Sequence, residues 1–232
     1  MVSRRLNSNH TLIYISMKTA LLINGISYGP RGRDWRRERE NLYNNIINPL
    51  NADVYLNTYP NETTQELIDF YRPKKVQLIE FAGSDPRTTI KQGIEMLSDV
   101  DFDLAITTRF DIKWNAPISQ YNIDPTKINF LFREKGWWDE SGYDGYKYGL
   151  SYMKYTSDIT TFSAFPKKFI PVLAETIQEV YRTPHRYTGD TDLHPLYSYL
   201  LPKIGEENMH IVCDQQELSH QNNQYHYDRI SL

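Results

Sequence analysis

Short apolar runs alternate with helical patterns along the first half of the sequence, and this alternation limits the possible folds more than any other feature. Residues 63–73 and 85–100 place apolar side chains three or four apart, as an amphipathic helix does. The apolar runs around them are typical of buried strands and cover Thr19–Gly25, Ala52–Tyr59, Lys75–Phe81 and Phe102–Ile112. This order predicts an α/β fold with a mostly parallel central sheet flanked by helices.

One further helix is predicted in the first half, and the second half is less regular. Leu42 and Ile46 lie four residues apart in a pattern that we expect to end before Pro49. Later in the chain we expect a strand near Lys127, a long aromatic and glycine-rich loop, helices over residues 166–182 and 189–205, and a strand beginning near Ile211.

The length of the chain fits one domain of this class. The sequence has 232 residues, and a domain holds about 100–200, with α/β folds often longer. Met17 directly precedes the first apolar run, so we expect residues 1–16 to be an N-terminal extension and residues 17–232 to be a single domain.

Composition excludes several classes of protein. The 26 Lys and Arg residues are balanced by 29 Asp and Glu residues, which argues against a dedicated nucleic-acid binder. No apolar run approaches the ~18 residues of a membrane span, and the single cysteine, Cys213, fits a reducing, cytoplasmic location. The sequence contains neither a G-x-G-x-x-G motif after the first strand nor a Walker A motif. The 18 Tyr and 4 Trp residues offer flat apolar faces with a polar group, which suit sugars and nucleobases.

The stretch LAITTRFDIKW is an apolar run that ends in two charged residues, Arg109 and Asp111. Ligands of open parallel sheets bind beyond the carboxyl ends of the strands, so this position predicts a site. A carboxylate there suits Mg²⁺ or Mn²⁺, whereas an arginine suits phosphate. A simple ion pair at the strand end is the alternative interpretation. The literal Asp-x-Asp sequence, Asp101 to Asp103, lies at the amino end of the same run and is expected to be a solvated strand entrance.

The order TALLINGISYG, NLYNNIINPLNADVYLNTY, LIDFYRPKKVQLIEF and DLAITTRFDIKW resembles small GT-A-type glycosyltransferases of large DNA viruses and bacterial surface-polysaccharide clusters. The resemblance covers about residues 18–115 and implies a GT-A-like domain in which residues 17–115 bind a UDP- or GDP-sugar and residues 116–232 bind a carbohydrate or glycoprotein acceptor. It implies Mn²⁺ or Mg²⁺ at Asp111. Arg109 replaces the first aspartate of the family's Asp-x-Asp motif, which brings the need for a metal into question. For a viral enzyme the location would be the host cytoplasm.

The same resemblance implies roles for residues that follow the first two strands. Asn24, Gly25 and Tyr28 would lie near the base or ribose, and Arg31 or Arg33 near phosphate. Thr58, with the tyrosine after it, would contact the nucleotide from the end of the second strand. An ordinary solvated loop explains the basic residues equally well.

The second half supplies candidates for the remaining functions. An inverting transferase needs a carboxylate to accept the proton of the acceptor hydroxyl, and we expect Asp190, Asp192 or Asp139 to serve. Asp190 reads equally well as a helix N-cap. The resemblance implies that a late histidine, His220 or His226, completes the metal site, although a histidine in a polar tail is often simply exposed.

Two other functional classes remain open from the sequence. A non-catalytic nucleotide- or glycan-binding module of the same fold would bind a nucleotide sugar and show no turnover. A metal-dependent phosphoesterase or nucleotidyltransferase would use Asp111 with the late acids and histidines, and would hydrolyse or transfer nucleotides. The sequence has no run of closely spaced metal ligands, which counts against the second class.

Overall fold

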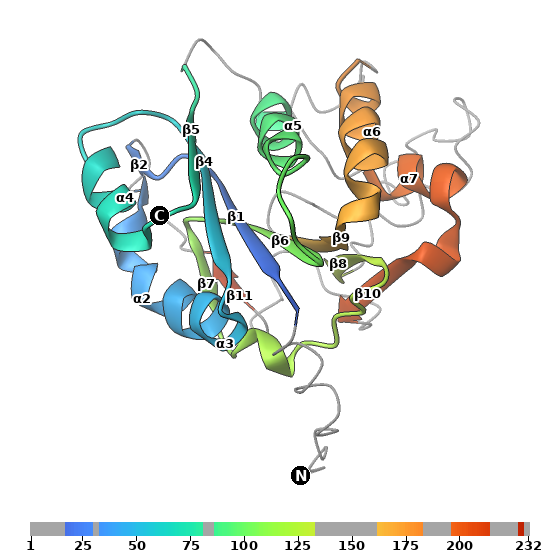
Figure 1. Cartoon of the computed structure of the whole chain (residues 1–232), viewed down its shortest axis with the longest axis horizontal. Coiled ribbons are helices and arrows are strands. Elements are labelled where there is room, and N and C mark those ends of the chain that lie inside the picture. The colour runs from blue at the N-terminus through green and yellow to red at the C-terminus, as the bar shows by residue number, and fades with distance from the viewer. Residues whose placement is uncertain are drawn as a thin grey trace, which may run out of the picture.

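A seven-stranded sheet forms the centre of the protein in a computed structural model that describes residues 17–29, 33–80, 86–132, 162–182, 196–213 and 227–229 (Figure 1). The strand order is β10-β8-β9-β6-β1-β4-β5, and every strand is parallel to its neighbours except β9, which is antiparallel to both β6 and β8. The strands are β1 (Thr19–Gly25), β4 (Asp53–Thr58), β5 (Lys75–Leu78), β6 (Leu104–Arg109), β8 (Ile128–Phe132), β9 (Phe162–Pro166) and β10 (Met209–Cys213). The expected α/β class with a mostly parallel central sheet is confirmed.

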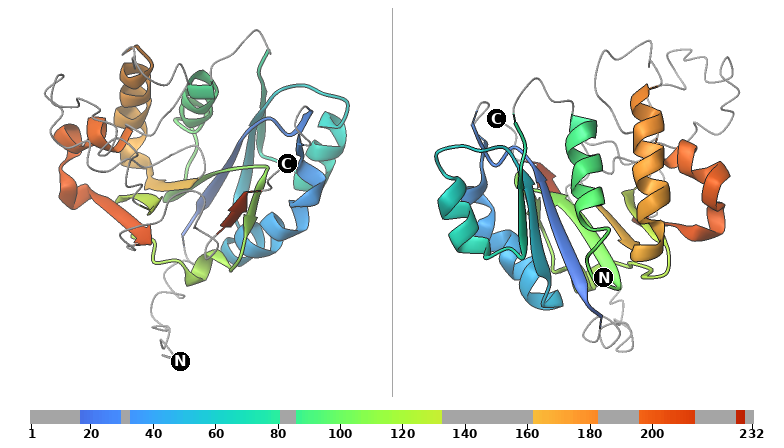
Figure 2. Two further views of the ribbon diagram at one scale, coloured as in Figure 1. Left: turned by 180° about the vertical axis from the view of Figure 1, so that it is seen from behind. Right: turned by 45° about the horizontal axis from the view of Figure 1, so that its top comes forward.

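Helices cover both faces of this sheet (Figure 2). One face carries α2 (Arg39–Leu42), a π-helical turn (Tyr43–Ile47), α3 (Asn48–Leu50) and α4 (Thr64–Tyr71). The other face carries α5 (Pro86–Met96), α6 (Ile170–Arg182) and α7 (Leu196–Ile204). Short 3₁₀ turns span Trp35–Arg37, Ile118–Gln120, Lys167–Phe169 and Glu206–Asn208. Within the described ranges, no helix combines the length and the apolar character that crossing a bilayer demands.

The side chains of β1 alternate between the two helical layers. Leu21 and Ile23 belong to the core on the α2 and α4 face, whereas Ala20 and Leu22 belong to the core beneath α5 and α6. Each fully buried apolar side chain contributes about 1.5–3 kcal/mol relative to an exposed one. Burial on both faces explains why the strand reads as a continuous apolar run and not as an alternation.

The chain changes direction across the sheet next to β1. It runs from β1 to β4 and β5 on one side, and α5 then carries it back to β6 on the other side of β1. Such a point, between two strands whose connections leave in opposite directions, is where open α/β sheets bind ligands. The carboxyl ends of β1 and β6 therefore mark the place to look for a site.

The predicted helix end before Pro49 is wrong, because the helical path continues through Pro49 to Leu50. The turn ahead of the proline is π-helical, with the Asn48 N–H donating to the Tyr43 carbonyl five residues earlier. Proline lacks an N–H and crowds the carbonyl four residues before it, so a widened turn accommodates it. The helical path ends at Asn51, which adopts a left-handed conformation with φ 46°.

The predicted strand over residues 102–112 is also too long. Strand β6 ends at Arg109, a turn holds Phe110 and Asp111, and the chain resumes as β7 (Ile112–Trp114). Strand β7 pairs with β11 (Tyr227–Arg229), which brings the C-terminal segment alongside it. Neither β9 nor β11 was predicted, since their pairing partners lie far away in the sequence. A last two-stranded ladder joins β2 (Tyr28–Gly29) and β3 (Arg33–Asp34).

Side chains of α2 and the turn after it hold β7 in place. The Trp114 N–H donates to Asn41 Oδ1 over 2.7 Å, and the Asn41 Nδ2 donates back to the Trp114 carbonyl over 2.8 Å. Asn45 Nδ2 donates to the same carbonyl over 3.1 Å. The segment that follows Asp111 is therefore fixed by hydrogen bonds that do not depend on Asp111.

Candidate functional site

Arg109 and Asp111 form a closed ion pair at the carboxyl end of β6. Arg109 Nε donates to Asp111 Oδ1 over 2.8 Å, and Arg109 Nη2 donates to Asp111 Oδ2. The two side chains are only 20% and 17% exposed. The ion pair that the sequence left as an alternative is present, in the bidentate geometry that gives the strongest Arg–carboxylate contacts. The pair lies beside the point where the chain changes direction.

A row of polar side chains crosses from β4 to β6 at one level of the sheet. The strand register sets Asn57 of β4 opposite Asn24 of β1, and Asn24 opposite Arg109. Partners at one level of a parallel sheet point to the same face, which here is the α5 face. Asn57 Nδ2 donates to Asn24 Oδ1 over 3.1 Å and to the Thr89 carbonyl over 2.5 Å. We call Asn57, Asn24 and Arg109 the polar row.

The amides of the polar row retain unused hydrogen-bonding capacity. Asn57 Oδ1 is buried and has no partner in the part of the chain that the structure describes. The Asn24 side chain accepts a hydrogen bond from Asn57 through Oδ1, and its Nδ2 group donates to no described residue. Unpaired amide groups beneath a ligand edge are candidates for contacts to a ligand or to water.

Gly93 lets α5 lie directly on the polar row. An ideal Cβ at residue 93 would stand 2.3 Å from Asn24 Oδ1 and 2.8 Å from Asn57 Nδ2. Any side chain at Gly93 would therefore displace the amides. Asn57 and Gly93 were not predicted as site residues, although each left a signal in the sequence: a polar residue inside a buried strand, and a glycine inside an amphipathic helix.

A second polar group joins the loops after β1 and β4 on the opposite face. The Thr58 hydroxyl donates to the Gly25 carbonyl over 2.7 Å and lies 3.2 Å from Ser27 Oγ. Asn61 Nδ2 donates to Ser27 Oγ over 3.0 Å. Gly25 adopts φ 103°, where a side chain would be strained. Gly25 and Thr58 therefore shape the edge of the site, and Ser27 and Asn61 were missed because their link spans 34 residues.

A buried tryptophan, Trp35, anchors the described part of the loop after β1. Trp35 is 1% exposed, and its Nε1 donates to Thr63 Oγ1 over 3.1 Å. The Thr63 hydroxyl donates in turn to Asn61 Oδ1 over 2.8 Å. The Trp35 N–H also donates to the Ser27 carbonyl over 2.8 Å. Trp35 and Thr63 therefore link Ser27, at the start of this loop, to Asn61 of the loop after β4.

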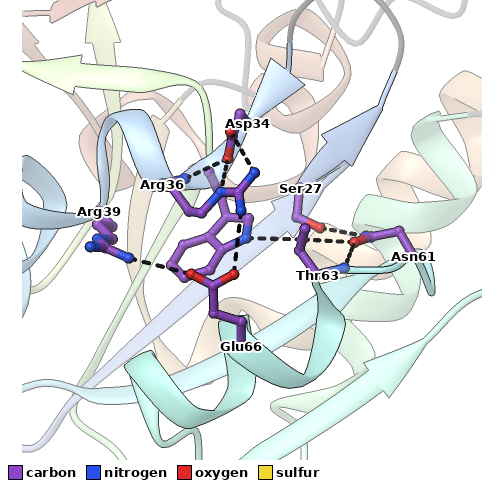
Figure 3. Close-up of polar contacts among 8 residues, drawn as sticks. Ser27, Asp34, Arg36, Arg39, Asn61, Thr63 and Glu66 are labelled. Carbon is purple, nitrogen blue, oxygen red and sulfur yellow. Dashed lines mark hydrogen bonds and ion pairs between the residues drawn. The ribbon is translucent and has the colours of Figure 1, made fainter.

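Charged residues around this anchor neutralise one another. Arg36 Nε and Nη2 donate to Asp34 Oδ1 and Oδ2 over 2.8 and 2.9 Å, and Arg36 Nη1 donates to Glu66 Oε2 over 3.4 Å. Arg39 Nη1 lies 3.6 Å from Glu66 Oε1 (Figure 3). The hydrogen bonds from Arg36 lower the pKa of Asp34 below its ordinary value. Asp34, Arg36, Arg39 and Glu66 therefore form a structural network.

Tyr28 lies on the β2–β3 hairpin next to that network. The Arg36 guanidinium carbon stands 5.4 Å from the centre of the Tyr28 ring. A hydrogen bond with Glu62, together with the charge of that carboxylate, raises the pKa of Tyr28. Contact between Tyr28 and a base or ribose stays a prediction.

The literal Asp-x-Asp sequence lies at the opposite end of β6, as expected. Asp103 Oδ2 accepts from the Lys18 backbone N–H over 2.8 Å, and Asp101 pairs with the Lys18 ammonium group. A hydrogen bond from Lys18 lowers the pKa of Asp101. Both aspartates serve the entrance of β1 and β6, far along the strands from Arg109.

The structure thus brings together five of the predicted site residues and leaves others undescribed. Asn24, Gly25, Thr58, Arg109 and Asp111 all lie at the carboxyl edge of the sheet. The predicted residues that lie outside the described ranges are Arg31, Asp139, Asp190, Asp192, His220 and His226.

The described residues around Asp111 do not fit a divalent cation. Both carboxylate oxygens of Asp111 accept hydrogen bonds from Arg109. No group of three or more His, Cys, Asp and Glu side chains that could hold a metal occurs within the ranges the structure covers. Mg²⁺ and Mn²⁺ prefer free oxygen ligands. Their binding with His220 stays a prediction from the resemblance.

Comparisons with known proteins give similarity in fold alone. No family model matches the sequence, and no curated protein matches it. A glycosyltransferase involved in glycosylation of the major capsid of PBCV-1 is 15% identical, with 85% of this chain and 82% of that chain covered and a TM-score of 0.46.

Two further solved structures are similar at the same level. Mouse xyloside xylosyltransferase 1 is 9% identical, with 85% of each chain covered and a TM-score of 0.48. A protein from Desulfovibrio desulfuricans G20 assigned as a nucleotide-diphospho-sugar transferase is 11% identical, with 87% and 81% covered and a TM-score of 0.48. Identities this low and TM-scores below 0.5 say nothing about the reaction, so the function has to be inferred from the residues of the site.

Proposed function

We propose that the protein is a GT-A-like glycosyltransferase that moves a sugar from a nucleotide diphosphate sugar to a hydroxyl group of a carbohydrate or glycoprotein. One observation carries this proposal: Arg109, Asp111 and Asn24 meet where the chain changes direction between β1 and β6. That place is the usual ligand crevice of an open α/β sheet, and its guanidinium suits a diphosphate.

The donor is a UDP- or GDP-sugar in this proposal. Its diphosphate lies over the end of β6, and its nucleoside extends toward the ends of β1 and β4. Three features support this orientation: the free Nδ2 of Asn24, the backbone opened by Gly25 at φ 103°, and the loops joined through Thr58. Tyr28 on the neighbouring hairpin offers an aromatic ring at the nucleoside end.

The reaction is a displacement at the anomeric carbon. The acceptor oxygen forms a new bond to this carbon while the bond to the diphosphate oxygen breaks, and the electron pair leaves with the nucleoside diphosphate. The hydroxyl proton passes to a carboxylate, for which we propose Asp190, Asp192 or Asp139. The transferred group is a hexosyl or pentosyl unit, and we assign the reaction to the cytoplasm, which suits the single cysteine.

A thermal-shift screen of nucleotide sugars with the full chain tests the proposal, followed by assays of sugar transfer and donor hydrolysis. A donor at 100 times its dissociation constant is expected to add about 2.7 kcal/mol of stability by mass action. Stabilisation by a UDP- or GDP-sugar together with turnover supports a transferase. Stabilisation without turnover on any acceptor or on water would favour the non-catalytic module, and no stabilisation by any donor would contradict the proposal.

A further inference from the structure

Arg36 and Arg109 each form a bidentate ion pair with an aspartate. The surroundings of the two pairs differ, and this difference indicates a role for Arg109. Arg36 and Arg109 each place Nε on Oδ1 and Nη2 on Oδ2 of an aspartate two residues away, with Nε–Oδ1 distances of 2.8 Å in both cases. The two bidentate Arg–Asp pairs, or forks, have the same geometry. The groups around each guanidinium therefore decide whether it can bind a further ligand.

The remaining terminal nitrogen of Arg36, Nη1, donates a hydrogen bond to a second carboxylate, that of Glu66 (Figure 3). The Arg36 guanidinium carbon stands over the Tyr28 ring, 5.4 Å from the ring centre. Arg109 has no second carboxylate among the described residues, and none of them accepts a hydrogen bond from its Nη1. The guanidinium carries five N–H donors, of which Asp111 takes two.

Arg109, whose Nη1 has no acceptor among the described residues, is also the less exposed of the two arginines. The Arg109 side chain is 20% exposed, whereas that of Arg36 is 37% exposed. Polar groups withdrawn from water are normally hydrogen-bonded, so free donors on the more buried guanidinium point to a missing acceptor. Asn24 on the adjacent strand lies at the same level, and its Nδ2 group has no acceptor among the described residues. Both groups are donors, and together they suit an oxygen-rich anion.

We propose that Arg109 supplies the positive charge that holds the donor diphosphate, and that donor binding consequently needs no divalent cation. This inference rests on the proposed function. Asp111 acts as a positioning residue that aligns the guanidinium, and the free Nη1 and Nη2 donors bind phosphate oxygens. As the bond between the anomeric carbon and the diphosphate oxygen breaks, the electron pair passes to that oxygen, where the hydrogen bonds from Arg109 stabilise the growing charge.

A cation at Asp111 would have to compete with this arrangement. It would displace two charge-assisted hydrogen bonds and would leave the Arg109 guanidinium close to another positive charge. The guanidinium therefore stands where a metal would otherwise neutralise the phosphates. A chelator such as EDTA cannot remove this charge, because it belongs to the protein.

Isothermal titration calorimetry of the full chain with UDP and with GDP tests the proposal, in EDTA and in Mn²⁺. For the wild type we expect the same dissociation constant in both buffers for whichever nucleotide binds. In EDTA, Arg109→Ala is expected to weaken nucleotide binding by about tenfold or more, as for the loss of a hydrogen bond to a charged group. Arg109→Lys keeps the charge but not the fork, so we expect it to weaken binding by less.

A double variant separates binding by Arg109 from mere neutralisation of Asp111. Arg109→Ala with Asp111→Ala removes both charges, so no uncompensated carboxylate repels the phosphates. We expect it to bind the nucleotide as weakly as Arg109→Ala. Arg36→Lys is the matched control, because Arg36 forms the same bidentate pair with Asp34 but its Nη1 is already hydrogen-bonded to Glu66. We expect this variant to leave the ratio of the nucleotide affinities in EDTA and in Mn²⁺ unchanged.

The outcomes distinguish this inference from the proposed function. Nucleotide binding that disappears in EDTA and returns with Mn²⁺ would overturn the role of Arg109 and leave the transferase proposal intact. Wild-type affinity in the double variant would overturn it as well. No binding of UDP or GDP in either buffer would overturn both proposals together. Circular dichroism melts of each variant establish that the chain is folded in the titration.

Discussion

The two ends of β6 carry the same kinds of charged residue in different settings. At the amino end the Lys18 and Asp101 side chains are 69% and 81% exposed, whereas at the carboxyl end those of Arg109 and Asp111 are 20% and 17% exposed. Exposed ion pairs are screened by water and contribute little, while sheltered ones are held in one geometry. The direction of the strand therefore separates a solvated entrance from a candidate site.

The two ion pairs also differ in how far their neighbours connect them to the rest of the sheet. Arg109 faces Asn24 on the next strand, and Asn24 connects to Asn57 and through it to α5. Asp103 accepts a hydrogen bond from the backbone of Lys18, the residue that immediately precedes β1. A change at the carboxyl end should therefore reach the function, and a change at the amino end should not.

Among the substitutions that leave Arg109 in place, Asp111→Ala has the largest expected effect. It releases Arg109 from its fixed orientation, and misplacing a substrate-binding group by about 1 Å can cost about 100-fold in rate. We expect kcat/KM for the nucleotide-sugar donor to fall by that order, as measured by release of nucleoside diphosphate. The melting temperature should stay close to that of the wild type, because Trp114 and Asn41 hold the following strand independently.

Asp111→Asn provides the control for this effect. The amide keeps the size of the side chain but lacks the charge and one of the two acceptors for the fork. Its activity should fall between those of the wild type and Asp111→Ala. Unchanged turnover in Asp111→Ala would show that Asp111 has no part in the site, and that the two ends of β6 do not differ in their importance for turnover.

Gly93→Ala tests how far the polar row depends on close packing. The new Cβ would meet Asn24 Oδ1 at 2.3 Å, and overpacking of this kind costs about 1–3 kcal/mol. The gain in helix propensity of about 1 kcal/mol offsets part of it. We expect a lower midpoint in urea unfolding and weaker nucleotide binding, since the displaced amide of Asn24 adjoins Arg109.

Glu95→Ala is the matched control on the same helix, because Glu95 is exposed and its one ion pair among the described residues is with Lys91. It should change neither nucleotide binding nor, beyond a few tenths of a kcal/mol, the stability. If Gly93→Ala bound nucleotide as tightly as Glu95→Ala, the amides would have no part in the site.

The first half of the fold could be predicted because its signals are local. The apolar run at Thr19–Gly25 and the helical spacing of Ile90 and Ile94 depend on burial alone, and burial imposes a period on the sequence. Strands β9 and β11 could not be predicted, since each is defined by a partner far away along the chain. The widened turn before Pro49 also depends on packing that no short window of sequence contains.

The site divides in the same way. Strand polarity was enough to place Arg109 and Asp111 at the ligand edge. The link from Ser27 to Asn61 and the link from Asn24 to Asn57 could not be predicted, because a hydrogen bond between two side chains requires the register of two strands to be known. The sequence therefore identified the charged pair and three neutral residues of this edge, and missed Asn57, Ser27 and Asn61, whose hydrogen bonds connect the strands and loops.

Asp101→Ala has the smallest expected effect, and it tests the comparison most directly because it destroys the literal Asp-x-Asp sequence. Among the described residues the carboxylate forms an ion pair with Lys18 alone, and both side chains are largely exposed. We expect the turnover, the nucleotide affinity and the melting temperature of the wild type. The pKa of Asp101 is lowered by the hydrogen bond from Lys18, so the small stabilisation exists above the ordinary carboxyl pKa and is lost as the pH falls through the lowered value. Any difference in melting temperature should therefore vanish in acid. A loss of turnover in Asp101→Ala comparable to that in Asp111→Ala would mean that the site lies at the amino end of β6, which strand polarity argues against.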